Sequence, residues 1–353
     1  MANGVSGYAA ISARVRAMYS SLLSPQDFAR LSDSPDFPTL IAQLKTTAYG
    51  PYLENLKDRD LTPQKVDLAI KGRLADAYYS VIQMAPKHAR PLLRQLYRYF
   101  EVANLKAILR GIVTGAGWER IQDVLFPMGE MTVVPAQAML ESGDVGTAIE
   151  LLHGTPYYDT LSYAMRRYSA EKNLFPLEVA LDLYYWRQLW HEAKKLRGED
   201  RQQAMRIIGS LMDVNNLMWV IRYKVYQGLS EEEVINYTLP FGYHVRDEDV
   251  RAIAAGADLA SVVRRVFPFV PDLNTLLENP RQGLPQLEVL LKRHVMQQCL
   301  SAFTGNPFHI GIPLAFLILS DLEIQDLTVL IEAKASQMPE EEYLPFMLRT
   351  IET

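Results

Sequence analysis

One short stretch of this chain resembles a metal-binding motif. His191 and Glu192 begin like the zinc helix of a metalloprotease, in which a second histidine follows the first by four residues. In this chain Lys195 occupies that position. The six histidines are scattered, and Cys299 lies near His294 without further residues at ligand spacing. The sequence therefore predicts no metal site.

Phosphate-binding and nucleophile motifs are also missing. A P-loop ends in Gly-Lys-Ser/Thr, and the chain contains no such triplet. Gly115 and Gly117 form the only G-x-G, but Arg120 stands where a third glycine would be, and a helical stretch precedes the motif. That pattern is typical of a helix stop. There is no G-x-S-x-G. We expect no catalytic residue, no cofactor and no small-molecule substrate, so the protein is not an enzyme.

Composition narrows the class of protein. Of the 353 residues, 49% are hydrophobic and 22% charged, the balance of a soluble globular protein. The formal net charge of −5 argues against nucleic acid as a partner. A single cysteine excludes an internal disulfide. The start of the chain does not resemble a secretory signal, and the longest apolar run, Ile310 to Leu319, is about half a membrane span, so it predicts a buried helix.

One phrase occurs three times at nearly even spacing. It reads EVANLKAILR from Glu101, DVNNLMWVIR from Asp213 and EIQDLTVLIE from Glu323. The copies start 112 and 110 residues apart (213 − 101 and 323 − 213). A domain-sized period predicts three copies of one helical module. We place them at 1–135, 136–247 and 248–353, each with the phrase on a buried central helix.

A second pattern recurs upstream of the phrase. Residues 28–52 and 138–158 share their order of apolar residues, a small-residue corner and a closing Thr-x-Tyr, and 253–266 is a looser third version. Each predicts two short helices. Apolar residues elsewhere recur every three or four positions, and no pair of strands with a tight turn is visible. The predicted fold class is all-α.

Polar residues recur within the repeated phrase. Asn104, Asn216 and Asp326 stand three residues after the acid, inside a helix predicted to be buried. Asparagine favours helices poorly and is costly to bury without a partner, so we expect a hydrogen bond to a neighbouring segment. Ligand binding is the alternative. Arg110 and Arg222 also recur, but the third copy has Glu332.

Basic residues cluster before the first two central phrases. One stretch contains Lys87, Arg90, Arg94 and Arg98, and the other contains His191, Lys194, Lys195 and Arg197. Such stretches are more often a solvated helix face, and in an acidic protein the alternative is a docking face for an acidic partner. The candidate partner-binding residues are Arg90, Arg94, Arg98, Lys194 and Lys195. The third copy has the apolar run Ile310 to Leu319 instead.

Taken in order, these segments resemble the C subunit of archaeal and bacterial V-type (A-type) rotary ATPases, whose counterpart in the eukaryotic vacuolar enzyme is the d subunit. The residues that carry the resemblance are YAAISARVRAMYSSLLSPQDF from Tyr8, TLIAQLKTTAYGPYL from Thr39, the phrases around Asn104 and Asn216, and FHIGIPLAFLILSDLEIQDLTVLIEAKASQMP from Phe308. They span the chain from about Tyr8 to Pro339.

The resemblance implies three similar helical domains in a pseudo-threefold, funnel-like arrangement. It also implies a non-catalytic rotor subunit that links the central stalk to the proteolipid ring and transmits torque for proton or sodium transport. Such a protein is peripheral, on the cytoplasmic side of the membrane. We expect the basic stretches to assist stalk docking in its socket. The alternative is an unrelated three-repeat helical scaffold or adaptor.

Overall fold

The computed structural model describes residues 2–57, 61–271 and 273–349, and within these ranges the regular elements are all helices. This confirms the predicted all-α class. The long helices are α5 (Pro63–Met84), α6 (Arg90–Thr114), α11 (Phe175–Lys195), α12 (Gly198–Arg222), α17 (Pro280–Ser301) and α18 (Gly311–Ala335).

Shorter helices connect and cover the long ones. They are α1 (Ala2–Tyr19), α2 (Pro25–Ser32), α3 (Phe37–Leu44), α4 (Gly50–Leu53), α7 (Trp118–Gln122), α8 (Ala136–Glu141), α9 (Val145–Glu150), α10 (Tyr158–Glu171), α13 (Glu231–Asn236), α14 (Asp247–Ala254), α15 (Leu259–Val266), α16 (Leu273–Glu278) and α19 (Glu340–Tyr343). Two 3₁₀ turns, Gly129–Met131 and Leu344–Phe346, and a π-turn, Tyr223–Gln227, complete the described elements.

The three repeated phrases lie on α6, α12 and α18, each 25 residues long. Buried side chains surround much of each helix, and residues 311–320 of α18 are buried without interruption, as predicted for the apolar run. Gly115 ends α6 in the left-handed conformation with φ 65°, which glycine adopts without a Cβ penalty. The G-x-G motif is therefore the predicted helix stop.

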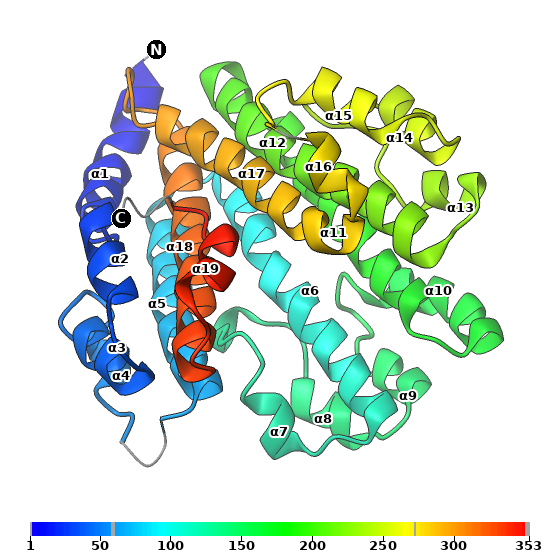
Figure 1. The fold of residues 1–353 in the computed structure, drawn as a ribbon, viewed down its shortest axis with the longest axis horizontal. Coiled ribbons are helices and arrows are strands. Elements are labelled where there is room, and N and C mark those ends of the chain that lie inside the picture. Colours follow the sequence, from blue (N-terminus) through cyan, green and yellow to red (C-terminus); the bar gives the residue numbers. More distant parts are fainter. Residues whose placement is uncertain (1, 58–60, 272, 350–353) are drawn as a thin grey trace.

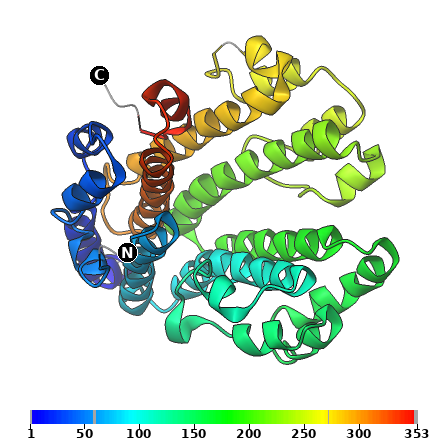
Figure 2. The ribbon, with the colours of Figure 1, turned by 60° about the horizontal axis from the view of Figure 1, so that its bottom comes forward.

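The six long helices pack as a closed series around a common axis. Each central helix forms a hairpin with the long helix before it in the chain and packs against a second long helix from another hairpin. The second contacts join α6 to α11, α12 to α17 and α18 to α5. Figure 2 shows these three pairs of helices spreading apart toward one end of the molecule.

Pairs of short helices, which the second repeated pattern predicts, pack on the central helices. α8 packs on α6, α14 on α12 and α3 on α18. The second helix of each pair begins with an aspartate N-cap whose carboxylate accepts a backbone N–H: Asp36 from Thr39 at 2.8 Å, Asp144 from Thr147 at 2.8 Å and Asp258 from Ser261 at 2.9 Å. The same local signal thus sets the same turn three times.

The hairpin turns meet at the end of the molecule opposite the spreading helix pairs. Asp200, at the start of α12, accepts hydrogen bonds from the Tyr8 hydroxyl of α1 at 2.8 Å and from the Ile310 backbone at 2.8 Å. Its carboxylate also lies 2.9 Å from Nε2 of His88, in the α5–α6 turn. One carboxylate therefore joins α1 and the turns of all three hairpins.

Candidate functional site

The acid that opens each repeated phrase is buried and tied to a distant backbone. Glu101, Asp213 and Glu323 are exposed by 1%, 0% and 0%. Glu101 accepts the Val133 N–H at 2.6 Å, Asp213 accepts the Val245 N–H at 3.0 Å, and Glu323 accepts the Leu23 N–H at 2.8 Å. Each donor lies just before a short-helix pair. Each acid therefore fixes a short-helix pair to a central helix.

The polar residue three positions after each acid also forms hydrogen bonds with the backbone of a distant segment. Asn104 exchanges two hydrogen bonds with the Phe126 backbone, at 2.9 and 2.7 Å. Asn216 donates to the Leu239 and Phe241 carbonyls and accepts the Leu239 N–H at 2.9 Å. Asp326 accepts the Leu348 N–H at 2.5 Å. The predicted structural hydrogen bond is confirmed.

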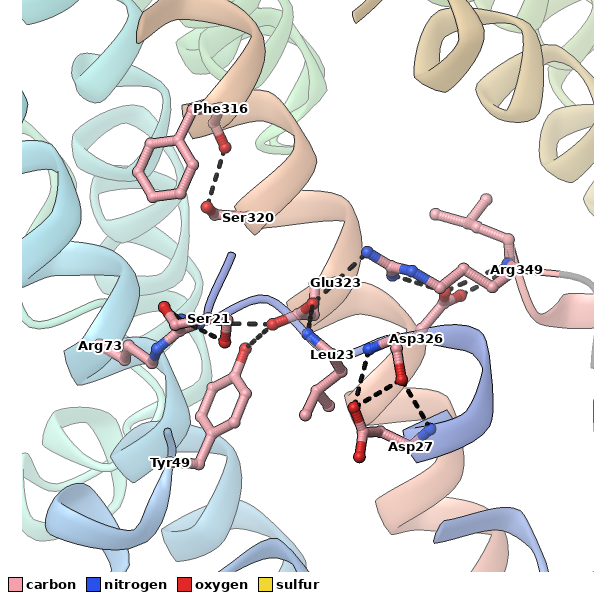
Figure 3. Close-up of polar contacts among 12 residues, drawn as sticks. Ser21, Leu23, Asp27, Tyr49, Arg73, Phe316, Ser320, Glu323, Asp326 and Arg349 are labelled. Atoms are coloured by element: carbon pink, nitrogen blue, oxygen red, sulfur yellow. Dashed lines mark hydrogen bonds and ion pairs between the residues drawn. The ribbon is translucent and has the colours of Figure 1, made fainter. Parts of the chain in front are cut away.

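The third copy is completed by the opposite end of the chain, as Figure 3 shows. Glu323 accepts the Tyr49 hydroxyl at 2.7 Å and contacts Arg73 at 3.3 Å and Arg349 at 3.5 Å. Arg349 also contacts Asp326 at 3.1 Å. We call this set, Leu23, Tyr49, Arg73, Glu323, Asp326 and Arg349, the terminal clasp. It holds residues from both ends of the chain on α18.

The first copy has an equivalent of the clasp tyrosine. The Tyr157 hydroxyl donates to Glu101 at 2.5 Å, as Tyr49 does to Glu323. Both tyrosines follow a threonine by two residues, and each backbone N–H is bonded to that threonine hydroxyl. The Thr-x-Tyr pattern was visible in the sequence, but its acidic partner was not.

Burial favours the neutral form of the Asp213, Glu323 and Asp326 carboxyl groups, whereas their hydrogen-bond donors favour the charged form. It raises the pKa of Glu323, and Arg349, Tyr49 and Arg73 oppose the rise. It likewise raises the pKa of Asp326, opposed by the Leu348 N–H and Arg349. Burial raises the pKa of Asp213 to about 7 against three backbone donors from residues 243–245.

An axial cavity lies between the long helices, and all six contribute to its wall. The lining is aromatic and charged, and its members are Tyr78, Leu96, Tyr99, Phe100, Tyr185, Trp186, Leu211, Val214, Asn215, Met218, Trp219, Arg222, Glu288, Lys292, Val295, Ile318, Asp321, Leu322 and Gln325. Tyr99 is 46% exposed, although loss of surrounding water raises the pKa of its hydroxyl. A side chain on a concave wall that solvent still reaches can be partly exposed and yet have a raised pKa.

The charged residues of the axial cavity form one connected network. Glu288 pairs with Arg222 and, at 2.9 Å, with Lys292. Lys292 donates to Gln325 at 3.0 Å, and Gln325 donates to Asp321 at 3.0 Å. Burial raises the pKa of Asp321 to about 6, and Lys292 and Gln325 oppose the rise. The network connects α12, α17 and α18.

The recurring arginines bridge neighbouring hairpins. Arg110 of α6 pairs with Glu178 of α11 at 2.6 Å, and Arg222 of α12 pairs with Glu288 of α17. In the third copy Thr328 of α18 donates to Asp67 of α5 at 2.6 Å. The acidic partners Asp67, Glu178 and Glu288 stand 111 and 110 residues apart (178 − 67 and 288 − 178), so they share the spacing of the repeated phrase. The repeated phrase alone did not identify them, because they lie on other helices.

The five predicted partner-binding residues lie outside the axial cavity. Arg94 and Lys194 are exposed, and Lys195 is exposed and pairs with Glu192 at 2.7 Å. Arg90 is half-buried and donates to the Ala85 and Gln83 carbonyls. Arg98 is half-buried, with a guanidinium nitrogen 3.3 Å from Gln95. None of the five is part of the cavity wall, and their predicted role in partner binding stays a prediction.

The two positions considered as possible metal ligands in the sequence have other roles in the structure. Lys195, which replaces the second histidine of a zinc helix, forms an ion pair with Glu192. Cys299 is buried, and burial raises the pKa of its thiol. Among the described residues, no three His, Cys, Asp or Glu side chains gather as metal ligands. In the same ranges no helix is long and apolar enough to cross a membrane.

The fold and these ties define an all-helical protein in which three central helices with a repeated sequence phrase stand around an axial cavity. The chain belongs to the ATP synthase (C/AC39) subunit family, whose family model matches residues 11–344. It is a non-catalytic component of a V/A-type rotary ATPase, the C or d subunit, which excludes the alternative of an unrelated scaffold.

Relatives named as the C subunit of an A-type ATP synthase extend over nearly the whole chain. The protein of Methanocaldococcus jannaschii is 24% identical over 95% of this chain and 84% of its own. That of Pyrococcus horikoshii is 26% identical over 93% of this chain and 87% of its own. That of Archaeoglobus fulgidus is 25% identical over 95% of this chain and 94% of its own.

Proposed function

We propose that this protein belongs to the central rotor, where it links the central stalk to the membrane proteolipid ring and transmits torque between them. The observation that carries the proposal is the axial cavity, to which all six long helices contribute. The hairpin turns close the opposite end around Asp200. A molecule with two unlike ends on one axis is suited to join two partners in line.

Resistance to twisting is the second requirement of such a linker. Buried hydrogen-bonding groups hold the covering helices on the central ones, and leaving one such group without its partner costs about 1–3 kcal/mol. The terminal clasp adds the same constraint between the two ends of the chain. These ties favour rotation of the protein as one body.

The proposal includes three domains, 1–135, 136–247 and 248–353, in a pseudo-threefold, funnel-like arrangement. The ties from Glu101 to Tyr157 and from Glu323 to Leu23 would then cross between domains. Each domain would be held by a neighbour as well as by its own packing. Such interlocking supports torque transmission through all three.

We assign stalk docking to the axial cavity instead of the basic stretches, because Arg94, Lys194 and Lys195 lie outside its lining. The protein would then sit peripherally on the cytoplasmic side, with the closed end toward the membrane. The cavity offers aromatic surface with balanced charge, Arg222 and Lys292 against Glu288 and Asp321. A stalk tip with mixed apolar and polar side chains fits this wall.

Purification of the tagged protein from native membranes tests the assignment. We expect the proteolipid, the central stalk and the catalytic ATPase subunits to co-purify with it. Stalk docking is tested with Asn215→Cys in the cavity wall and Tyr163→Cys as control, because Tyr163 is 89% exposed on α10 and the native Cys299 is buried. Assembly should protect only the Asn215→Cys thiol from a maleimide. Equal labelling of both variants in the assembled enzyme contradicts docking in the cavity.

A further inference from the structure

A cluster of exposed basic side chains lies where the α5–α6 and α11–α12 turns meet. Five of them make no ion pair or side-chain hydrogen bond with any residue in the described ranges: Lys87, Arg94, Lys194, Arg197 and Arg201. We call this set the basic end. It belongs to a chain whose formal net charge is −5, so the positive charge is locally concentrated.

The two turns form one continuous surface. A shallow hollow between them is lined by His88 and Pro91 from the first turn and by Lys195, Leu196 and Arg197 from the second. The nearby acids are already engaged. Asp200 is bonded to Tyr8 and His88, Glu192 to Lys195, and Glu199 to Asn306. The five cations therefore face solvent without a carboxylate paired directly to them among the described residues.

The composition of this surface decides between a protein and a lipid partner. Protein interfaces have an apolar core rich in aromatic residues and poor in lysine. Within residues 85–94 and 191–201 no large hydrophobic side chain is exposed, and the bordering Met84 is 40% exposed. Clustered Lys and Arg without an aromatic core are suited to the phosphates of an anionic membrane surface.

We propose that the basic end binds the phosphate headgroups of an anionic lipid bilayer. The inference goes beyond the rotor assignment, because it concerns contact with lipid and not with the stalk or the ring. Each Lys or Arg near an anionic surface strengthens binding about fivefold. Association through such charges also weakens as salt screens them.

Sedimentation of the purified full chain with vesicles tests the proposal. Wild type should bind vesicles that contain phosphatidylglycerol, bind far less to pure phosphatidylcholine vesicles, and lose affinity as sodium chloride rises. The triple variant Arg94→Glu, Lys194→Glu, Arg197→Glu should bind at least about a hundredfold more weakly. Its melting temperature should match wild type, because all three side chains are exposed.

The matched control reverses three exposed basic residues elsewhere, with Lys57→Glu, Arg120→Glu and Arg166→Glu. It changes the net charge equally and should bind the anionic vesicles within a few fold of wild type. Equal losses in both variants, or equal wild-type binding to neutral vesicles, overturn the proposal. It is also overturned if the basic-end variant keeps vesicle binding but no longer co-purifies with membrane subunits, because the basic end would then contact protein. Vesicle binding needs neither stalk nor ring, so its failure leaves the rotor assignment untouched.

Discussion

Single buried side chains on the central helices hold distant segments in place. Asn216 is fully buried, and its amide serves three backbone groups of residues 239 and 241. The sequence predicted that this position bonds to a neighbouring segment, because an amide in a buried helix requires a partner. It did not indicate which segment, because the partner lies 23 to 25 residues further along an irregular stretch.

Asn216→Leu should lower the free energy of unfolding by on the order of 1–3 kcal/mol, because the Leu239 N–H loses its acceptor in a buried site. Urea unfolding measures the change. The adjacent Asn215→Leu is the control, since Asn215 is half-buried and donates only to the Leu211 carbonyl of its own helix. Its loss should stay below about 1 kcal/mol. Equal losses in the two variants would contradict the assigned role.

Asp321 should give the stability a measurable pH dependence. Burial raises its pKa to about 6, so between about pH 4 and 6 the folded protein binds a proton that the unfolded chain releases. The contribution of Asp321 to stability therefore falls as pH rises through this window. Asp321→Asn does not titrate, so the variant should gain about 1 kcal/mol relative to wild type between pH 5 and pH 8. Urea unfolding of both proteins at the two pH values is the measurement, and a constant difference between them would refute the prediction.

Ion pairs between helices α6 and α11 differ in their surroundings. Lys106 and Asp182 pair at 2.7 Å with side chains 22% and 25% exposed, whereas the Arg110 side chain beside Glu178 is 62% exposed. Burial raises the pKa of Asp182, and Lys106 opposes the rise. Loss of the lysine leaves a largely desolvated carboxylate, whereas an exposed pair contributes little.

Lys106→Met should therefore destabilise the protein by roughly 1–3 kcal/mol, and Arg110→Met by less than about 1 kcal/mol. Thermal unfolding of wild type and of the two variants measures these losses of stability. A larger loss for Arg110→Met would mean that the exposed pair carries the contact between α6 and α11.

The helices themselves could be predicted from local signals. Thr62 before Pro63 and the Ser230–Glu233 capping box are start signals that can be read from the sequence, and both begin helices. Gly115 ends a helix as predicted. The pairing of α6 with α11 and of α18 with α5 could not be predicted in this way. Periodicity shows that a helix face is buried but not which helix covers it.

At the scale of the molecule, the terminal clasp joins the two ends of the chain. No local pattern could show that Glu323 meets Leu23, Tyr49 and Arg73, because those residues lie some 250 to 300 positions earlier. The threefold repetition gave an indirect signal. Leu23 and Tyr49, which bond to the third acid, stand 110 and 108 residues before Val133 and Tyr157, which bond to the first (133 − 23 and 157 − 49).

Arg349→Met should weaken this closure. The change removes a cation from two buried carboxylates, Glu323 and Asp326, and should cost about 3–5 kcal/mol. Hydrogen exchange should quicken first in α2–α4, which the clasp holds against α18. Arg30→Met is the control, because its pair with Asp27 is exposed and should contribute less than about 1 kcal/mol. Unchanged exchange in α2–α4 would show that the clasp does not hold the chain ends.

Rotation together with the stalk is the central claim of the rotor assignment, and ATP hydrolysis by the cross-linked enzyme tests it most directly. A cysteine at Asn215 can be cross-linked to the central stalk in the assembled complex, since Asn215 lines the axial cavity and the native Cys299 is buried. If the protein turns with the stalk, the cross-linked enzyme should hydrolyse ATP at the rate of the uncross-linked enzyme. If cross-linking stops hydrolysis and cleavage of the cross-link restores it, the protein does not rotate with the stalk, and the rotor assignment is contradicted.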